Sequence, residues 1–337
     1  CCTTCDKFLA DRLVTGECPN CNYPDARGDQ CDSCAKLLNP TELLEPKCTV
    51  CSTSPELKLT KHLYIDLPKL TPALTEWQNA SMEKGKWTNN AKSTTKSWMD
   101  TGLNPRPITR DLKWGVNVPK EGFEGKVFYV WFDAPLGYVS ITKNAFPDSW
   151  ESWWLNPDNV ELYQFMGKDN IPFHSVIFPA TQIATGKNWT KVHQLNVTEY
   201  LNYEEEKFSK SRNVGVFGTH VVETGLNIDL FRFYLLAIRP ESHDSQFVWT
   251  EFQDRCNNEL IDNICNLVNR ILVYNNKNFP GEYKAAEYQD EHKAFIEDLK
   301  TLQTQYTDYM EVGELKNGLK AAMAAGKAAN KFFQDQA

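Results

Sequence analysis

The sequence has no long apolar run. None of its 337 residues lies in a stretch approaching the roughly 18 apolar residues that a membrane-spanning helix needs, so we expect no such helix. Basic residues are also in the minority, with 36 Lys and Arg against 44 Asp and Glu. The net charge of −8 argues against nucleic-acid binding through bulk charge, although a local basic patch stays compatible with it.

The start of the chain lacks two further features. Residue 1 is Cys1 rather than an initiator Met, and no basic region followed by an apolar core opens the sequence, as in a secretory signal. We therefore expect the true start to lie upstream. A composition of 41% hydrophobic and 24% charged residues is that of a globular chain, and the length fits two or three domains.

Cysteine is concentrated at one end of the chain. Nine of the eleven cysteines lie within residues 1–51, and eight of these form C-x-x-C pairs: Cys2 and Cys5, Cys18 and Cys21, Cys31 and Cys34, Cys48 and Cys51. A C-x-x-C turn suits two corners of a zinc tetrahedron, so four pairs predict two structural zinc ions. The inner pairs are close together, so we expect them to share one ion and the outer pairs the other. Sequential pairing, a disulfide framework and a redox role are the alternatives.

The remainder of the chain divides into an α/β part and a helical part. Strands alternating with helices favour a parallel sheet, and the pattern turns helical beyond about residue 224. The predicted strands cover 62–70, 126–134, 161–167 and 192–201, with a helix over 175–186.

A loop with two lysines and two serines follows the last of these strands. It reads Lys207-Phe208-Ser209-Lys210-Ser211. Ammonium groups neutralise phosphate oxygens and hydroxyls donate hydrogen bonds, so the loop suits a polyphosphate. It is not a Walker A loop, because the G-x-x-x-x-G-K pattern is absent. On composition alone, an exposed basic loop is the alternative.

This loop resembles the KMSKS signature of class I aminoacyl-tRNA synthetases, and the segments around it resemble the methionyl-tRNA synthetase family. These segments are GECPNC and GDQCDSC, FYVWFDAPLGY and FMGKDNIPFH, and FRFYLLAIRPE and NNELIDNICNLVNR. They follow the family's order over nearly the whole chain. The doubled knuckles and Phe208 resemble the eukaryotic and archaeal branch.

The resemblance implies an α/β fold: the second half of a class I Rossmann-like catalytic domain with a zinc-knuckle connective insertion, followed by an α-helical anticodon-binding bundle. The implied segments are the knuckles (1–62), the rest of the insertion (63–114), the half-domain (115–215), a link (216–250) and a truncated bundle (251–337). The family's H-x-G-H or H-x-G-N signature is absent. We therefore expect a fragment with half an active site that does not aminoacylate tRNA alone.

The implied activity is that of a cytoplasmic, ATP-dependent methionine–tRNA ligase. Such an enzyme forms methionyl-adenylate and pyrophosphate, then charges tRNA(Met) for translation initiation and elongation. Mg²⁺ is implied with ATP, no membrane partner is implied, and the branch often joins multi-synthetase complexes. The alternatives are a non-catalytic, zinc-stabilised RNA-binding fragment or paralogue, and a synthetase for Leu, Ile or Val.

The resemblance also assigns roles to single residues in the catalytic half. Lys210 would stabilise the leaving pyrophosphate, while Lys207, Ser209 and Ser211 would order the loop around it. The methionine pocket would be lined by Trp131, Ala134, Pro135, Tyr138, Phe173, His174 and Phe178. A thioether favours polarizable aromatic walls, and a Tyr hydroxyl and an imidazole can hydrogen-bond its sulfur. Taken alone, the same aromatic residues would predict an ordinary core.

The remaining implied contacts are with ATP and the anticodon. Gly167 and Asp169 would meet the ribose and adenine, with Lys168 as a phosphate contact. Asn266 and Arg270 lie four residues apart on one helix face and would read anticodon bases. The family tends to have Asn where this chain has Asp262, which puts that contact in doubt; solvated helix residues are the alternative.

Overall fold

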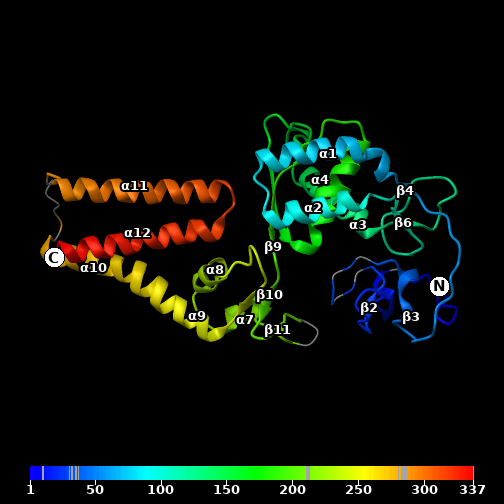
Figure 1. The fold of residues 1–337 in the computed structure, drawn as a ribbon, viewed down its shortest axis with the longest axis horizontal. Helices are drawn as coiled ribbons and strands as arrows, with labels where there is room; N and C mark the ends of the chain where they lie inside the picture. The colour runs from blue at the N-terminus through cyan, green and yellow to red at the C-terminus, as the bar shows by residue number, and fades with distance from the viewer. Residues whose placement is uncertain are drawn as a thin grey trace. The chain divides into compact units, whose positions relative to one another are not determined.

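The computed structural model describes residues 1–9, 11–29, 31, 33–34, 36, 38–209, 213–279, 281 and 287–336. The chain forms two compact units (Figure 1). The first comprises Cys1–Lys84, Lys92–Tyr163 and Asp169–Gln194, and the second Gly85–Ala91, Gln164–Lys168 and Leu195–Ala337. Within the described residues, no helix is both long and apolar enough to cross a membrane.

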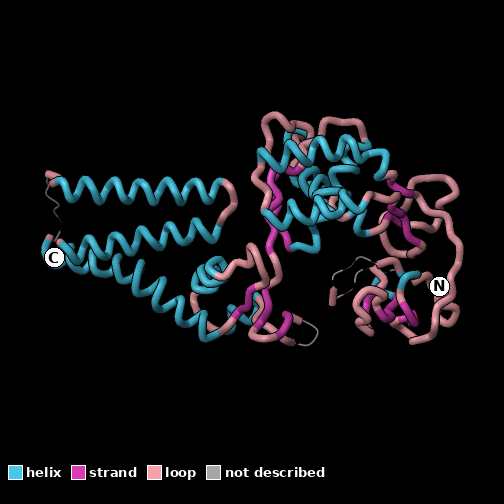
Figure 2. The backbone as a smooth tube through the Cα atoms, viewed as in Figure 1, coloured by secondary structure: helices cyan, strands magenta, loops and turns pink. Residues whose placement is uncertain are grey.

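The cysteine-rich segment of the first unit is mostly loop (Figure 2). Its regular elements are two short 3-10 helices (Asp11–Leu13 and Pro40–Glu42) and the strands β1 (Val14–Glu17), β2 (Ala26–Arg27) and β3 (Leu44–Cys48). The strands form an antiparallel sheet in the order β2-β1-β3. Its apolar core is small, with Val14, Ala26, Leu38 and Leu43 packed beside the buried cysteines.

Two helices follow, α1 (Leu67–Lys84) and α2 (Asn89–Thr101). The predicted strand over 62–70 is wrong beyond β4 (Tyr64–Ile65), because α1 already begins at Leu67. The Asp66 carboxylate accepts the Lys69 N–H at 3.4 Å, and Pro68 occupies the first turn, where its missing N–H costs nothing. Leu67 and Leu74 of α1 are buried against Val176 and Ala180.

Short strands and helices then build the middle of the first unit. These are β5 (Arg106–Pro107), β6 (Thr109–Arg110), β7 (Val127–Phe128), α3 (Val130–Asp133), α4 (Leu136–Ala145) and α5 (Trp150–Trp154). The predicted strand over 126–134 is wrong in its second half. The Tyr129 N–H is the last to pair across, with the Ile108 carbonyl at 2.9 Å, and the chain then turns into α3. An apolar run alone does not distinguish a strand from a helical turn.

Strands β8 (Leu162–Gly167) and β9 (Val192–Thr198) form a two-stranded sheet, which confirms the predictions at 161–167 and 192–201 in outline. Between them lie a 3-10 turn (Lys168–Asn170), a π-helix (Phe173–Ile177) and α6 (Phe178–Ala184), so the predicted helix over 175–186 is also confirmed. No sheet in the described residues exceeds three strands.

The second unit begins with a small mixed sheet and two helices. β10 (Leu201–Tyr203) pairs antiparallel with β11 (Glu206–Lys207) and parallel with β12 (Ser245–Phe247). Helices α7 (Gly218–Glu223) and α8 (Ile228–Ala237) complete this part. An aromatic core holds it together, with Phe231, Tyr234 and Phe247 nearly inaccessible to solvent.

The predicted helical character of the C-terminal part is confirmed. A long helix runs through α9 (Trp249–Arg255), a π-helix (Cys256–Cys265) and α10 (Asn266–Asn278). Helices α11 (Asp290–Glu311) and α12 (Leu315–Asp335) form an antiparallel hairpin, with Phe295 and Phe332 stacked at 4.1 Å (Figure 1). A Cβ at Gly326 would lie 2.3 Å from Ile264 Cδ1, so glycine lets α12 approach the π-helix closely.

Candidate functional site

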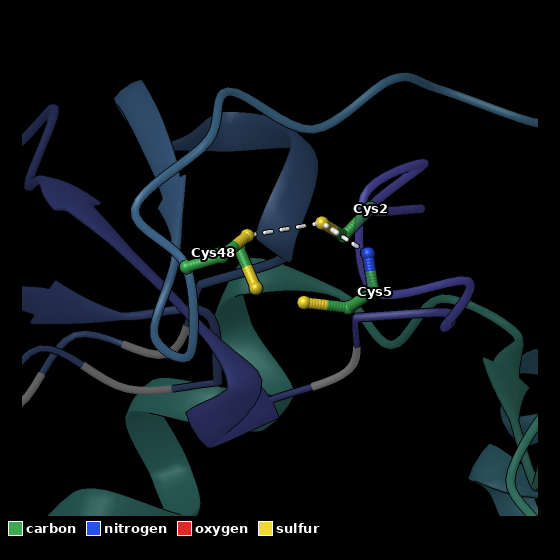
Figure 3. A group of neighbouring side chains, drawn as sticks. Cys2, Cys5 and Cys48 are labelled. Carbon is green, nitrogen blue, oxygen red and sulfur yellow. Dashed lines mark hydrogen bonds between the residues drawn. The ribbon is translucent and has the colours of Figure 1, made fainter.

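The eight paired cysteines gather into two sets of four. One set is Cys2, Cys5, Cys48 and Cys51, and the other is Cys18, Cys21, Cys31 and Cys34; the sulfur atoms within each set lie within 4.8 Å of one another. The outer pairs therefore join, as do the inner pairs, which confirms the nested pairing over the sequential one. Figure 3 shows the sulfurs of three members of the outer set turned toward one another. All eleven cysteines are free thiols.

Each C-x-x-C pair sits on the same kind of turn. In all four turns the N–H of the first cysteine donates to the carbonyl five residues later: Cys2 to Lys7, Cys18 to Tyr23, Cys31 to Lys36 and Cys48 to Thr53, at 2.8–3.0 Å. This closed turn brings the second thiol back beside the first. Backbone N–H groups also point at sulfur, from Cys5 to Cys2 and from Asn20 to Cys18, both at 3.4 Å.

The dimensions of both sets suit a metal ion. Zinc–sulfur bonds of about 2.3 Å imply a tetrahedron edge of about 3.8 Å, and the observed sulfur pairs lie 3.4, 3.6 and 3.8 Å apart. The backbone hydrogen bond from Lys36 and that of the Asn20 side chain lower the pKa of Cys34 to about 6. At Cys21 in the same set, the backbone hydrogen bond from Tyr23 lowers the pKa, but burial and hydrogen bonds among the neighbouring thiols outweigh it and raise the pKa to about 12. A metal ion binds the thiolate form, so its charge would favour ionisation of all four thiols.

A cavity of about 140 Å³ lies where α3, α4 and the π-helix meet in the first unit. It is lined by Trp131, Ala134, Pro135, Tyr138, Asn170, Phe173 and His174. Six of the seven residues assigned to the methionine pocket from the sequence thus come together. The seventh, Phe178, is buried behind the cavity, with its ring 6.0 Å from that of Tyr138.

Asn170 is the lining residue that the sequence reasoning missed. Its backbone carbonyl lies 2.9 Å from His174 Nδ1, and the Tyr138 hydroxyl lies 3.0 Å from His174 Nε2. Burial lowers the pKa of His174, so the ring is neutral at pH 7. A carbonyl only accepts, so Nδ1 carries the proton and Nε2 accepts from the Tyr138 hydroxyl. The imidazole therefore has no N–H left for a ligand, whereas the Tyr138 hydroxyl can turn its proton toward one.

A second cavity, of about 100 Å³, adjoins the first. The two share Trp131, Asn170 and Phe173, and the Trp131 and Phe173 rings stack at 4.9 Å. The second cavity is also lined by Asp169, which the sequence resemblance assigned to the ribose. The stacked rings of Trp131 and Phe173 line both cavities, so two chemical groups of a ligand could bind next to each other, one in each cavity.

The lysine loop continues from β11, which ends at Lys207. Ser209 pairs with Val214 through two backbone hydrogen bonds of 2.8 and 2.9 Å. Lys210 and Ser211 lie outside the described residues. Phe208 anchors the segment that leads into Ser209, with its ring 5.5 Å from Tyr203 and 6.0 Å from Phe217. That anchoring role was not predicted, although an aromatic residue inside a polar loop is the signal that could have found it.

Gly167 ends β8, and Asp169 sits in the 3-10 turn that follows. Lys168 between them donates to Glu199 at 2.6 Å and to Asp244 at 2.9 Å. Burial opposes the Lys168 charge, but these two carboxylates outweigh it and raise the Lys168 pKa. Lys168 thus joins the segments that carry Glu199 and Asp244, and its predicted phosphate contact stays a prediction.

The two residues assigned to the anticodon lie on α10. Asn266 is exposed, while Arg270 lies over the Phe333 ring at 4.8 Å and 3.4 Å from Asn330 Oδ1. Upstream, Asp262 is exposed and Asn263 is buried. The Asn263 side chain donates to the Met323 carbonyl at 2.8 Å, so it joins helices rather than offering an amide to a ligand.

Comparison with known proteins identifies the family. The model of the family "tRNA synthetases class I (M)" matches residues 1–272. The chain is 50% identical to methionine–tRNA ligase of Treponema denticola over 345 residues, 99% of this chain and 44% of that protein. It is likewise 50% identical to the cytoplasmic methionine–tRNA ligase of Arabidopsis thaliana, covering 99% of this chain and 43% of that protein. The chain thus spans less than half the length of these relatives.

A solved structure shares the fold. Mycobacterium tuberculosis methionyl-tRNA synthetase bound by methionyl-adenylate matches with a TM-score of 0.72 at 21% identity, covering 89% of this chain and 59% of that one. The mixture of helices and strands is therefore that of a class I synthetase fold. With the family model matched over residues 1–272, the chain belongs to the class I tRNA synthetases of the M type.

Proposed function

We propose that this protein is a methionine–tRNA ligase, which activates methionine with ATP and transfers it to tRNA(Met). The observation that carries this proposal is 50% identity over 99% of the chain to relatives with that name. The aromatic cavity supports it independently, because its walls suit a thioether side chain.

The cavity beside Trp131 and Phe173 binds the methionine side chain. The two stacked rings give the sulfur a polarizable wall. The Tyr138 hydroxyl, 3.0 Å from His174 Nε2, also donates to the methionine sulfur. A hydrocarbon such as norleucine offers no acceptor and gains no such contact, so it binds more weakly than methionine.

Activation joins a methionine carboxylate oxygen to the ATP α-phosphorus and breaks the bond from that phosphorus to the bridging oxygen of pyrophosphate. Lys210 stabilises the leaving pyrophosphate, and Lys207, Ser209 and Ser211 order the loop around it. Gly167 and Asp169 hold the adenosine. Mg²⁺ supplies charge neutralisation on the triphosphate when bound.

Both cysteine sets hold structural zinc. Four thiolates close the coordination sphere, so the ions stabilise the fold and activate no water. The sheet they flank has a small apolar core, which explains the need for them. Asn266 and Arg270 read anticodon bases. We assign the protein to the cytoplasm, as for the relatives named cytoplasmic.

The test is ATP–pyrophosphate exchange on the full-length gene product with each of the twenty amino acids. We expect exchange with methionine alone. Exchange with another amino acid overturns the substrate, and no exchange in a folded, zinc-loaded sample favours a non-catalytic RNA-binding role. The Tyr138→Phe variant should reduce the preference for methionine over norleucine, while Tyr163→Phe, outside the cavity, should leave it unchanged.

A further inference from the structure

Lys168 follows β8 directly, next to Gly167, the residue assigned above to the adenosine. Its ammonium group lies between the carboxylates of Glu199 and Asp244, at 2.6 and 2.9 Å, and 4.4 Å from the centre of the Tyr200 ring. One cation in the second unit thus contacts two segments that are distant from it in the sequence. We call Lys168, Glu199 and Asp244 together the Lys168 cluster.

Both carboxylates of the cluster are themselves held in place. The Asn90 side chain donates to Glu199 at 2.9 Å. Asp244 Oδ1, which accepts from Lys168, also accepts the Tyr200 N–H at 2.9 Å. The Lys168 and Glu199 side chains are only 30% and 16% exposed, so their pair differs from a mobile surface ion pair, which contributes little. Because its partners are fixed, the cluster can fix the backbone that carries Lys168.

The cluster stands where the sheet that leads into the lysine loop begins. Asp244 directly precedes β12, and Glu199 lies two residues before β10; these strands pair in parallel. On its other edge β10 pairs with β11, which ends at Lys207, the first residue of the loop. The Lys168 hydrogen bond lowers the pKa of Asp244 against the opposing effect of burial, and the charge of Lys207 lowers it further. Lys168 therefore connects the end of β8 to the strands that carry the lysine loop.

A lysine beside a nucleotide site could instead contact a phosphate directly. Here the Lys168 ammonium already lies within hydrogen-bond distance of two carboxylates, and a phosphate contact would require it to leave them. The cluster itself also carries more negative than positive charge, which repels a phosphate group. The contacts therefore favour a role within the protein over a contact with ATP.

We propose that Lys168 is a positioning residue for adenylate formation, which fixes the Gly167 turn relative to the lysine loop. The adenosine and the leaving pyrophosphate of one ATP molecule are thereby held in line with the attacking methionine carboxylate. This inference rests on the proposed function. A misplaced turn would slow the reaction although every residue that touches the substrates is still present.

The test measures methionine-dependent ATP–pyrophosphate exchange by the full-length gene product. Three variants are compared: Lys168→Met, the carboxylate variant Glu199→Gln with Asp244→Asn, and the triple variant that combines all three changes. The control is Arg255→Met, because that guanidinium is also held by two carboxylates, at 2.8 and 3.1 Å, but within one long helix. Circular dichroism and urea denaturation check that each variant folds.

We expect Lys168→Met and the carboxylate variant each to lower kcat/KM for ATP by about 10-fold to 100-fold, since a displacement of about 1 Å can cost about 100-fold. The triple variant should lose no more than the larger of these two effects, because residues that act as one unit are not additive. The KM for methionine should stay unchanged in all three, and Arg255→Met should react like the parent.

A direct phosphate contact predicts a different pattern. The carboxylate variant would then release Lys168 toward ATP and keep or raise kcat/KM for ATP, while Lys168→Met would lower it. That pattern, parent-like exchange in all three variants, or an equal loss in Arg255→Met would overturn the inference and leave the ligase intact. If Lys168→Met does not fold, the carboxylate variant decides, since parent-like kcat/KM for ATP in it overturns the inference. No exchange by the parent would overturn the proposed function and this inference with it.

Discussion

The nested pairing of the cysteines predicts how zinc is lost from double variants. Replacing Cys18 and Cys31 by serine removes two ligands from the same set, so one zinc ion should be lost and one kept. Replacing Cys2 and Cys18 removes one ligand from each set, so both ions should be lost. Sequential pairing predicts the reverse for each double variant.

The measured quantity is the number of zinc ions bound per chain, which is a whole number, so the two pairings are easily distinguished. A structural zinc binds with about 10–16 kcal/mol at neutral pH, and three or fewer thiolates leave the coordination sphere open. The assay is zinc content by mass spectrometry after exchange into buffer containing a moderate chelator. We expect two ions in the parent, one in Cys18→Ser with Cys31→Ser, and none in Cys2→Ser with Cys18→Ser.

The control is Cys265→Ser, an exposed cysteine outside both sets, which should keep two ions. Loss of both ions from the variant at Cys18 and Cys31, together with one retained in the variant at Cys2 and Cys18, would refute the pairing. Two ions in every variant would refute the zinc sites themselves.

Three further perturbations test the cavity and the lysine loop. Phe178→Ala should lower the free energy of unfolding by about 3–5 kcal/mol, because the ring is almost fully buried. Urea denaturation measures this loss, and a loss below about 1 kcal/mol would contradict a structural role of the ring. Gly215→Ala should slow ATP–pyrophosphate exchange at least tenfold with methionine affinity unchanged, since φ is +127° and a Cβ would lie 2.3 Å from Phe208; wild-type exchange would contradict this. Burial lowers the pKa of His174, so its contribution to stability is full above its unfolded pKa of about 6.5 and is lost as pH falls, by up to about 1.4 kcal/mol per unit. Denaturation at pH 5 to 8 should show this slope reduced in His174→Gln, and an unchanged slope would contradict it.

The local sequence predicted strands and helices best where the pattern of apolar residues is compatible with only one of the two. The runs at 161–167 and 192–201 became strands, and the C-terminal periodicity became helices. It failed at 62–70 and 126–134, where apolar residues pack equally well from a strand or from a helical turn. At 62–70 the Asp66 cap favours the helix that begins at Leu67. At 126–134 the strand ends after the Tyr129 N–H, which makes its last backbone hydrogen bond to the neighbouring segment.

The amino-acid sequence by itself determined which thiols come in pairs, because this depends on residue type and short spacing, which the sequence contains directly. The roles predicted for the aromatic residues and for the lysine loop came from the family resemblance, since residue type alone fits an ordinary core and an exposed loop equally well. Tertiary structure decided which pairs meet, because residues 2 and 48 are neighbours only after the sheet has formed. It also decided that the Tyr138 hydroxyl meets His174, and that Lys168 is bound by Glu199 and Asp244. Such contacts join distant segments, and their geometry exists only in the folded chain.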